Sequence, residues 1–274
     1  MPELPEVQTV VNQLRPLLLG KRLKSITPIW PKVFHNFKNS KIQKTMNGRM
    51  IINVKRRAKF IIIEFKDNII AVHLRMTGKL YLQSSKKPLP KYTSAYFSFD
   101  SDKILIFDDV RKFGRIYFYK TITPIDSRHG PEPLADNFNV DTFTNLFKTK
   151  RRNIKGLLLD QKVLAGLGNI YVDESLWASG IHPNSISNLI PLKKYALLHM
   201  NIKKILTNSI KQNGTTIIDF SVNGQSGKYV NKLKVYGRKS LNCMSCQDKI
   251  KKIRVAGRGT YVCTKCQRKY KSKA

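Results

Sequence analysis

The chain opens with the stretch MPELPEVQTVVNQLRPLLLG, residues 1–20, which combines a helical pattern with an unusual amino terminus. Pro5 and Glu6 are typical of a first helical turn, and Gly20 is typical of a helix end. The apolar residues between them recur at helical spacing, at Val7, Val10, Val11, Leu14, Leu17 and Leu18. The stretch therefore predicts an amphipathic helix at the very start of the chain.

The second residue of this stretch offers a distinct chemistry. Removal of Met1 would turn Pro2 into a free secondary amine with carboxylates at Glu3 and Glu6. Such an amine is a nucleophile that adds to an aldehyde-like carbon and forms a cationic imine. An ordinary amino terminus, with a proline at a helix start and acids in its first turn, fits the same six residues and is the commoner case. The hexapeptide alone does not decide between the two interpretations.

Length and composition favour a globular, intracellular protein. The 274 residues are 41% hydrophobic, which allows one large domain or two ordinary ones, each with a core. No apolar run approaches a membrane span, and the acid-bearing start does not resemble a signal peptide. We therefore expect a cytoplasmic location, no association with a membrane through a span, and no structural disulfides.

The charge of the chain is extreme and unevenly distributed. Fifty-one Lys and Arg face seventeen Asp and Glu, a formal net charge of +34. After Glu174 the only acidic residues are Asp219 and Asp248. A lysine-rich composition that keeps the protein soluble explains part of the excess, but not the loss of acids over the last hundred residues. Nucleic acid is the expected partner, and an anionic membrane surface is a weaker alternative because no basic amphipathic helix is evident.

The pattern after the first helix changes to strands. Short β-branched or aromatic runs separated by turn residues suggest an antiparallel sandwich. The runs are Lys59–Phe65, Ile69–Arg75, Lys79–Gln83, Tyr92–Phe99, Lys103–Phe107 and Arg115–Tyr119. Together with the first helix they predict an α+β fold whose N-terminal domain spans residues 1–123.

The second half of the chain predicts helices followed by a cysteine module. A proline-containing stretch at 124–140 is interpreted as a linker, and a helical domain is expected at 141–220. A loop region that contains glycines and serines is expected at 221–239, and the cysteine module is expected at 240–270. Ser221–Tyr229 is expected to be mobile. The predicted helices are Thr142–Lys148, Asn153–Asp160, Asn169–Ala178 and Leu192–Asn213.

The module holds all four cysteines of the chain. Cys243 and Cys246 form one Cys-x-x-Cys pair, Cys263 and Cys266 form the other, and sixteen residues separate the pairs. Two such pairs can place four thiolates tetrahedrally around one zinc ion, whereas two redox-active dithiols are a weaker interpretation. Four sulfur ligands leave no open position for chemistry, so the predicted zinc is structural.

Two further segments are suited to binding phosphate. The residues between the cysteine pairs, Lys251–Thr260, predict a β-hairpin with Arg258 exposed at its tip, where a guanidinium can grip phosphate. The glycine turn Ala165–Tyr171 leads into a helix, with Asn169 near its cap and free backbone N–H groups at its start. A solvated loop arginine and an ordinary turn between helices fit these two segments as well.

Taken together, these residues resemble those of a known family, the bacterial formamidopyrimidine-DNA glycosylases. The family's fold is an N-terminal helix with a β-sandwich, a helix-two-turns-helix domain and a zinc finger. The resemblance spans nearly the whole chain, through the segments Pro2–Glu6, Lys59, His73–Gly78, Asp109–Gly114, Gly168–Glu174, Gly214–Phe220 and the zinc hairpin.

The resemblance implies a bifunctional glycosylase and abasic-site lyase of base excision repair that acts on damaged double-stranded DNA as a monomer. It would excise oxidised purines such as 8-oxoguanine and formamidopyrimidines. Pro2 matches the nucleophile that forms a Schiff base, and Glu3 matches an acid that protonates the sugar ring oxygen. Lys59 matches a lysine that assists elimination, and Arg258 matches a finger arginine with a role in the second elimination.

The resemblance also implies DNA-binding residues. Met76, Arg111 and Phe113 match three residues that fill the void left by an extruded base. Lys150 and Asn169 match phosphate-binding positions, and the Gly214–Tyr229 region matches a loop that caps the lesion in purine-specific members. One segment departs from the family: a usual Lys-His-x-His is here Lys91–Ser94, so a DNA contact would fall to the hydroxyl of Tyr92 instead of a histidine.

Two rival functions stay open at the level of sequence. The first is the related endonuclease VIII branch, which acts on oxidised pyrimidines; Leu4 in the opening motif, where that branch usually has glycine, argues against it. The second is a non-catalytic DNA-binding protein that kept the zinc-containing scaffold. The presence of Pro2, Glu3 and Lys59 argues against the second rival.

Overall fold

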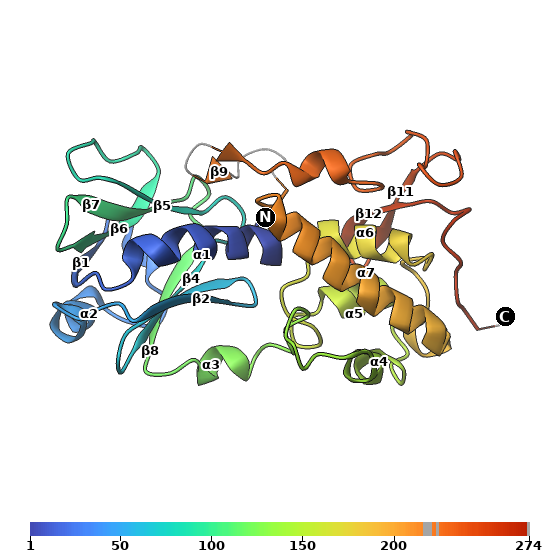
Figure 1. The fold of residues 1–274 in the computed structure, drawn as a ribbon, viewed down its shortest axis with the longest axis horizontal. Coiled ribbons are helices and arrows are strands. Elements are labelled where there is room, and N and C mark those ends of the chain that lie inside the picture. Colours follow the sequence, from blue (N-terminus) through green and yellow to red (C-terminus); the bar gives the residue numbers. More distant parts are fainter. Residues whose placement is uncertain (216–220, 223–224, 273–274) are drawn as a thin grey trace. The chain divides into compact units, whose positions relative to one another are not determined.

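The computed structural model describes residues 1–215, 221–222 and 225–272, and it divides the chain into two units (Figure 1). The first contains Met1–Ser127 and Asn213–Lys228, and the second contains Arg128–Gln212 and Tyr229–Ala274. Among the described residues, no helix has both the length and the apolar content needed to cross a membrane. The five-part division expected from the sequence stays a prediction.

Helix α1 (Leu4–Leu18) forms where the apolar periodicity predicts it. Glu3 is its N-cap residue, and Gly20, with a φ of +76°, follows its end. The apolar stripe of α1 is buried in the core of the first unit. Its start immediately behind Pro2 places the second and third residues of the chain in a buried position.

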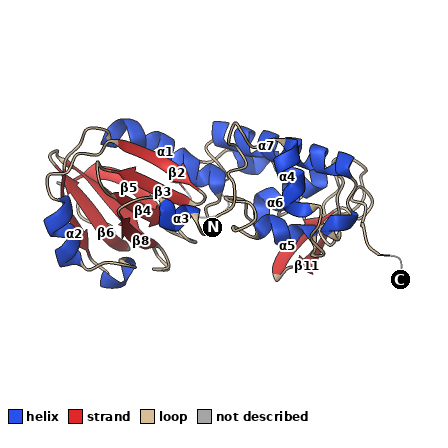
Figure 2. Ribbon diagram, turned by 90° about the horizontal axis from the view of Figure 1, so that it is seen from below, coloured by secondary structure: helices blue, strands red, loops and turns tan. Residues whose placement is uncertain are grey.

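Two antiparallel four-stranded sheets make up most of the first unit (Figure 2). One has the order β1-β6-β7-β5 and the other the order β2-β3-β4-β8. The strands are β1 (Leu23–Pro28), β2 (Asn53–Arg57), β3 (Phe60–Glu64), β4 (Ile69–His73), β5 (Lys79–Ser84), β6 (Thr93–Phe99), β7 (Lys103–Asp108) and β8 (Arg115–Tyr119). The expected fold class, α+β with an antiparallel sandwich, is confirmed.

The main core of the first unit lies between the two sheets and α1. Side chains from both sheets belong to one buried cluster, including Ile61 and Ile63 of β3 and Phe97 and Phe107 of the other sheet. Phe60 and Ile62, on the opposite face of β3, pack in a second cluster with Ile125 of α3 (Thr123–Asp126). Burial on both faces explains why β3 is an unbroken apolar run instead of an alternating one.

The sequence pattern missed β1 and β2 because neither strand alternates cleanly. Strand β2 (NVKRR) buries only Val54, and three of its five residues are basic. In β1 a register shift between Leu23 and Ser25 leaves the buried residues Leu23 and Ile26 three positions apart, so the alternation is broken. Helix α2 (Asn39–Met46) was missed for a similar reason, since Ile42 and Met46 are its only buried apolar residues among those with described side chains. A 3₁₀ turn at Pro31–Val33 precedes α2.

The second unit is mainly helical. Its helices are α4 (Val140–Phe147), α5 (Ile154–Leu159), α6 (Asn169–Ala178) and α7 (Leu192–Lys211), with 3₁₀ turns at Ser187–Leu189 and Tyr229–Lys232. The predicted linker carries more order than expected: α3 occupies its start, the Gly130 N–H donates to Gln161 O at 2.8 Å, and Phe138 is buried.

Two hairpins complete the fold. In the first unit β9 (Ser221–Val222) pairs with β10 (Gln225–Ser226), and Thr215 bridges to Lys228 at its base. Part of the expected capping segment, residues 216–220 and 223–224, lies outside the described residues. In the second unit β11 (Lys251–Val255) pairs with β12 (Arg258–Val262), as predicted from the residues between the cysteine pairs. Arg258 is the first residue of β12, directly after the Ala256–Gly257 turn.

Candidate functional site

The start of α1 holds Pro2 and Glu3 in a defined arrangement. Glu3 and Glu6 form a reciprocal capping box, in which the Glu3 side chain accepts from the Glu6 backbone N–H and Glu6 Oε2 accepts from Glu3 N at 2.9 Å. Pro2 and Glu3 are both buried, whereas Met1 is 56% exposed. The capping box therefore fixes the backbone on which the Pro2 nitrogen lies.

Glu6 also contacts the segment that follows α7. Its Oε1 accepts a hydrogen bond from the backbone N–H of Thr215 at 2.7 Å. Gly214, with a φ of +81°, makes room for this contact, because a Cβ there would lie 2.9 Å from Glu6 Oε1. One buried carboxylate thus joins the amino terminus to the start of the Gly214–Phe220 segment. Sequence reasoning assigned Glu6 no such role.

Lys59 lies in the two-residue turn between β2 and β3, beside Ala58, whose φ is +52°. Its side chain is buried, which is uncommon for lysine unless the ammonium group is paired. Arg56 fixes this turn to α1 by donating both to Gln8 Oε1 and to Ala58 O, each at 3.0 Å. Pro2, Glu3 and Lys59 therefore belong to neighbouring elements of the first unit.

The three residues expected to fill a void in DNA lie together on the surface of the same unit. Met76 and Phe113 are 43% and 47% exposed, so neither belongs to the core. Arg111 contacts both: its Nη1 donates to Met76 Sδ at 3.2 Å, and its guanidinium carbon lies 4.8 Å from the centre of the Phe113 ring. Two exposed apolar side chains around one arginine are suited to insertion between bases.

Tyr92 lies beside this group. Its side chain is exposed, and its backbone carbonyl accepts from Asp109 N at 3.0 Å, immediately before the loop that carries Arg111. Lys91 Nζ lies 5.6 Å from the centre of the Tyr92 ring. The tyrosine hydroxyl is thus presented next to a lysine on an exposed edge, where it can donate a hydrogen bond.

Asn169 and Arg258 come together in the second unit. Asn169 is the first residue of α6, and its Nδ2 donates to Gly259 O at 2.9 Å, next to the exposed Arg258. Gly168 is the N-cap residue of α6, and having no side chain it makes no side-chain capping bond. Lys150 is exposed in the loop after α4, and no hydrogen bond or ion pair joins it to Asn169 or Arg258 in the described part of the chain.

A buried ion pair supports the hairpin that carries Arg258. Lys155 Nζ lies 2.6 Å from Asp173 Oδ1 and 2.7 Å from Thr260 Oγ1, and Asp173 Oδ2 accepts from Tyr261 N at 2.9 Å. Burial raises the pKa of Asp173 to about 6, although the Lys155 ammonium and the Tyr261 N–H act to lower it. Helices α5 and α6 and strand β12 are thereby joined at one point.

Glu174 is a second buried carboxylate that holds a loop. Its oxygens accept from the backbone N–H groups of Lys234, Val235 and Tyr236 at 2.8–2.9 Å. Burial raises the pKa of Glu174 against the effect of these three donors. The carboxylate thus fixes the segment that leads from the 3₁₀ turn at Tyr229–Lys232 into the cysteine module.

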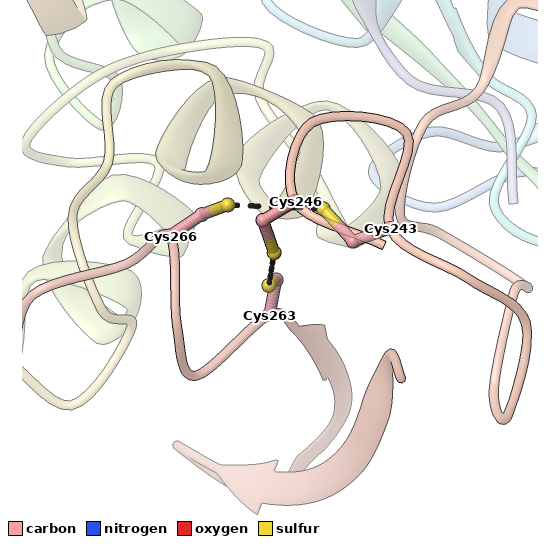
Figure 3. A group of neighbouring side chains, drawn as sticks. All are labelled: Cys243, Cys246, Cys263 and Cys266. Atoms are coloured by element: carbon pink, nitrogen blue, oxygen red, sulfur yellow. Dashed lines mark hydrogen bonds between the residues drawn. The ribbon is translucent and has the colours of Figure 1, made fainter. Parts of the chain in front are cut away.

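The four cysteines gather into one cluster, as the sequence predicts (Figure 3). Their sulfur atoms all lie within 4.8 Å of one another, with Cys246 and Cys263 at 3.4 Å and Cys243 and Cys266 at 3.8 Å. Zinc–sulfur bonds of about 2.3 Å in a tetrahedron place sulfur atoms about 3.8 Å apart, so the cluster fits one structural zinc ion. The Trp177 indole donates to Cys243 Sγ at 3.4 Å and links the cluster to α6.

Comparisons with protein families match the chain in three successive parts. Residues 1–116 match the formamidopyrimidine-DNA glycosylase N-terminal domain, and residues 129–221 match the H2TH domain of the same enzymes. Residues 240–268 match the zinc finger found in FPG and IleRS. The three matches cover most of the 274 residues.

Individual proteins match over nearly the same extent. The chain is 43% identical to the formamidopyrimidine-DNA glycosylase of Lactobacillus helveticus over 92% of its length and 93% of that protein. It is 38% identical to that of Herpetosiphon aurantiacus over 92% of its length and 94% of that protein.

Solved structures of a relative agree in fold. The chain is similar to a variant of the Lactococcus lactis protein in complex with Fapy-dG-containing DNA, with a TM-score of 0.92, 38% identity, and coverage of 98% of this chain and all of that one. The complex of the Lactococcus lactis protein with abasic-site-containing DNA gives a TM-score of 0.91 at the same identity, with coverage of 97% of this chain and all of that one.

Proposed function

The chain belongs to the formamidopyrimidine-DNA glycosylase family, and we propose on this basis that it excises oxidised purines from duplex DNA and then cleaves the strand at the abasic site. The observation that carries the proposal is the capped amino terminus, in which Pro2 and Glu3 are buried at the start of α1. The substrates are 8-oxoguanine and formamidopyrimidines, as the resemblance implies.

In the first step, the bond between the sugar and the damaged base is replaced by a bond between the sugar and the Pro2 nitrogen. The Pro2 nitrogen, free once Met1 is removed, bonds to C1′ while the glycosidic bond breaks; the bond's electron pair leaves with the base, which takes up the proton released from the proline nitrogen. Glu3 donates its proton to the ring oxygen, so the sugar opens and an iminium forms between the proline and C1′. With Met1 attached, the Pro2 nitrogen is an amide and cannot attack.

Two eliminations then cleave the strand. The iminium acidifies the C2′ hydrogen, and its loss expels the 3′ phosphate; a second elimination at C4′ expels the 5′ phosphate. Lys59, buried beside α1, is suited to assist proton transfer in these steps. Arg258 is exposed next to Asn169 and the start of α6, where it would bind phosphate.

Extrusion of the damaged base must precede this chemistry. Met76 and Phe113 would fill the vacated space, and Arg111 would donate to the acceptors of the orphaned cytosine. Tyr92 and Lys150 would add contacts to the DNA backbone. The charge of +34 supports binding of a polyanion along the chain. A monomer that acts on DNA in the cytoplasm is the arrangement we propose.

Borohydride trapping tests the proposal directly. With an 8-oxoguanine duplex, the protein should form a covalent adduct after reduction, and Pro2→Gly should lose most of it. Pro88→Gly, in an exposed loop, is the matched control and should trap like the unchanged chain. Intact mass shows whether Met1 has been removed from the protein used. A trimmed protein that gives no adduct would favour the rival of a DNA-binding protein without catalysis.

A comparison of lesions separates the proposal from the remaining rival. Excision from duplexes that carry 8-oxoguanine or thymine glycol should favour 8-oxoguanine by a clear margin. A preference for thymine glycol would assign the chain to the branch that acts on oxidised pyrimidines. Leu4, which is fully buried in the first turn of α1, is the sequence feature that argues for the purine branch.

A further inference from the structure

Two loops carry the three residues assigned to void filling, and both cross between the sheets. The loop 74–78 connects β4 to β5 and carries Met76, and the loop 109–114 connects β7 to β8 and carries Arg111 and Phe113. Because β4 and β8 are neighbours in one sheet and β5 and β7 are neighbours in the other, both loops leave the sandwich at the same edge.

Asp109 joins these loops through hydrogen bonds. Its side chain is 1% exposed, so it is shielded from solvent. Oδ1 accepts from Thr77 Oγ1 at 2.5 Å and from Arg111 N at 3.3 Å, and Oδ2 accepts from Gly114 N at 2.7 Å. The Thr77 hydroxyl also accepts from Arg111 N at 3.2 Å. One carboxylate and one hydroxyl thus connect the loop of Met76 with both ends of the loop of Arg111 and Phe113.

The ring of Phe107 joins the loops a second time. A Cβ at Gly78 would lie 2.9 Å from this ring, and a Cβ at Gly114 would lie 2.3 Å from it. Each loop therefore ends in a glycine that packs directly on the same buried ring, and a side chain at either position would separate the loop from it. Neither glycine has a positive φ, so close approach, and not backbone conformation, is what requires glycine here.

We propose that Asp109 and Thr77 are positioning residues that hold the two loops as one preassembled wedge. Met76, Arg111 and Phe113 are then presented together before DNA is bound, and little loop ordering has to be completed during base extrusion. This inference rests on the proposed function. It adds a buried pair that never touches DNA but sets the efficiency of extrusion.

Thr77→Val tests the pair with a side chain of nearly the same shape. The change removes the donor to Asp109 and the acceptor for Arg111 N, and it leaves the three wedge residues themselves unsubstituted. We expect kcat/KM for excision of 8-oxoguanine from a duplex to fall by about tenfold, the effect of losing a hydrogen bond to a charged group. Trapping on a single-stranded abasic oligonucleotide, which needs no extrusion, should stay unchanged.

Two further variants complete the comparison. Thr77→Ser keeps the hydroxyl and should restore most of the duplex activity. Thr121→Val makes the same replacement at an exposed threonine whose hydroxyl donates to Thr123, and should behave like the unchanged chain. Equal activity of Thr77→Val and the unchanged chain on the duplex, or an equal loss on both substrates, would overturn the inference.

Amide hydrogen exchange of the unchanged, DNA-free protein tests the same inference without any variant. The N–H groups of Arg111 and Gly114 donate to the pair and should exchange far more slowly than those of an open loop. Exchange at the rate of an unfolded chain would overturn the inference even if Thr77→Val failed to fold. Failure of the proposed function is distinguishable, because the unchanged protein would then trap neither substrate.

Discussion

The carboxylate of Glu6 lies between Glu3 and Thr215, accepting from Glu3 N at 2.9 Å and from Thr215 N at 2.7 Å. One oxygen accepts from a backbone N–H three residues earlier in the chain, and the other accepts from a backbone N–H 209 residues later. The residue that completes the helix cap behind Pro2 also fixes the beginning of the segment at Gly214. Both features depend on a full carboxylate.

Glu6→Gln should weaken both contacts. An amide side chain has one acceptor oxygen and an NH₂ group that cannot accept, so one of the two buried N–H groups loses its partner. We expect the free energy of unfolding of the first unit to fall by about 1–3 kcal/mol in urea titrations. Asp67→Asn removes the same charge from an exposed ion pair and should change it by about 0.5 kcal/mol at most. Equal midpoints for the two variants would contradict the prediction.

Loss of one cysteine should remove the zinc ion. Cys246→Ser leaves three thiolates, and metal analysis should show a zinc content well below one per chain. The hairpin β11–β12 depends on the metal for its order, so DNA affinity should fall as well. Met244→Ser, in the same Cys-x-x-Cys loop, keeps all four ligands and should retain both zinc and affinity. Stoichiometric zinc in Cys246→Ser would argue against the four-sulfur site.

Removing only one partner of the Lys155–Asp173 ion pair should lower the free energy of unfolding substantially. Lys155→Met leaves the Asp173 carboxylate buried without its cation, and we expect a loss of about 3–5 kcal/mol in the free energy of unfolding at pH 7. The double variant Lys155→Met/Asp173→Asn removes both charges and should recover much of that loss. A single variant as stable as the unchanged chain would show that the pair contributes nothing.

The raised pKa of Asp173 also predicts a pH dependence. Its folded-state pKa of about 6 lies above the ordinary pKa of an aspartate, 3.8, so protonation of Asp173 favours folding. This contribution is fully present below about pH 3.8, is lost as the pH rises through about 6, and amounts to about 3 kcal/mol. Relative to the double variant, the unchanged chain should therefore become less stable between pH 4 and pH 6 and stay level above it. A flat difference across this window would refute the assignment.

Arg258 should contribute one phosphate contact. Arg258→Ala should weaken binding to DNA of any sequence and reduce the slope of log affinity against log salt by about 1. Arg254→Ala, at an exposed position of the other strand of the same hairpin, removes an equal charge and should change the slope less. Equal slopes for both variants would mean that Arg258 acts only through net charge.

The turn of this hairpin leaves room for stabilisation. Ala256 and Gly257 have φ values of +49° and +72°, the signature of a two-residue type I′ turn, in which alanine is strained and asparagine is favoured. Ala256→Asn should therefore stabilise the second unit by about 1 kcal/mol and leave zinc content unchanged. A lower midpoint of urea unfolding for Ala256→Asn than for the unchanged chain would contradict the assignment of a type I′ turn.

Most of the fold follows from local patterns in the sequence. Apolar periodicity predicts α1 because its buried face carries the signal, and α6 and β8 also have the predicted bounds. Strand β2 was missed because its basic residues mask the alternation, and β1 was missed because its register shift places the buried residues Leu23 and Ile26 three positions apart. The cysteine cluster was predictable because spacing alone brings four sulfur atoms together.

The supporting contacts of the site were less accessible to sequence reasoning. Glu6, Asp109 and Asp173 are buried carboxylates whose partners are backbone N–H groups or residues far along the chain, and no local pattern encodes such pairs. Lys155 did leave a signal, since it is a lone charge in the apolar helix IKGLLL. A charge in such a place predicts a buried partner but does not identify it.

The burial of Pro2 has a practical consequence for anyone who produces this protein. Under the proposed function, an affinity tag or any other extension at the front of the polypeptide would convert the Pro2 nitrogen, the proposed nucleophile, into an ordinary amide while leaving the zinc module and the basic composition of the chain intact. Such a preparation would still find DNA and occupy lesions without repairing them, so purification handles belong at the opposite end.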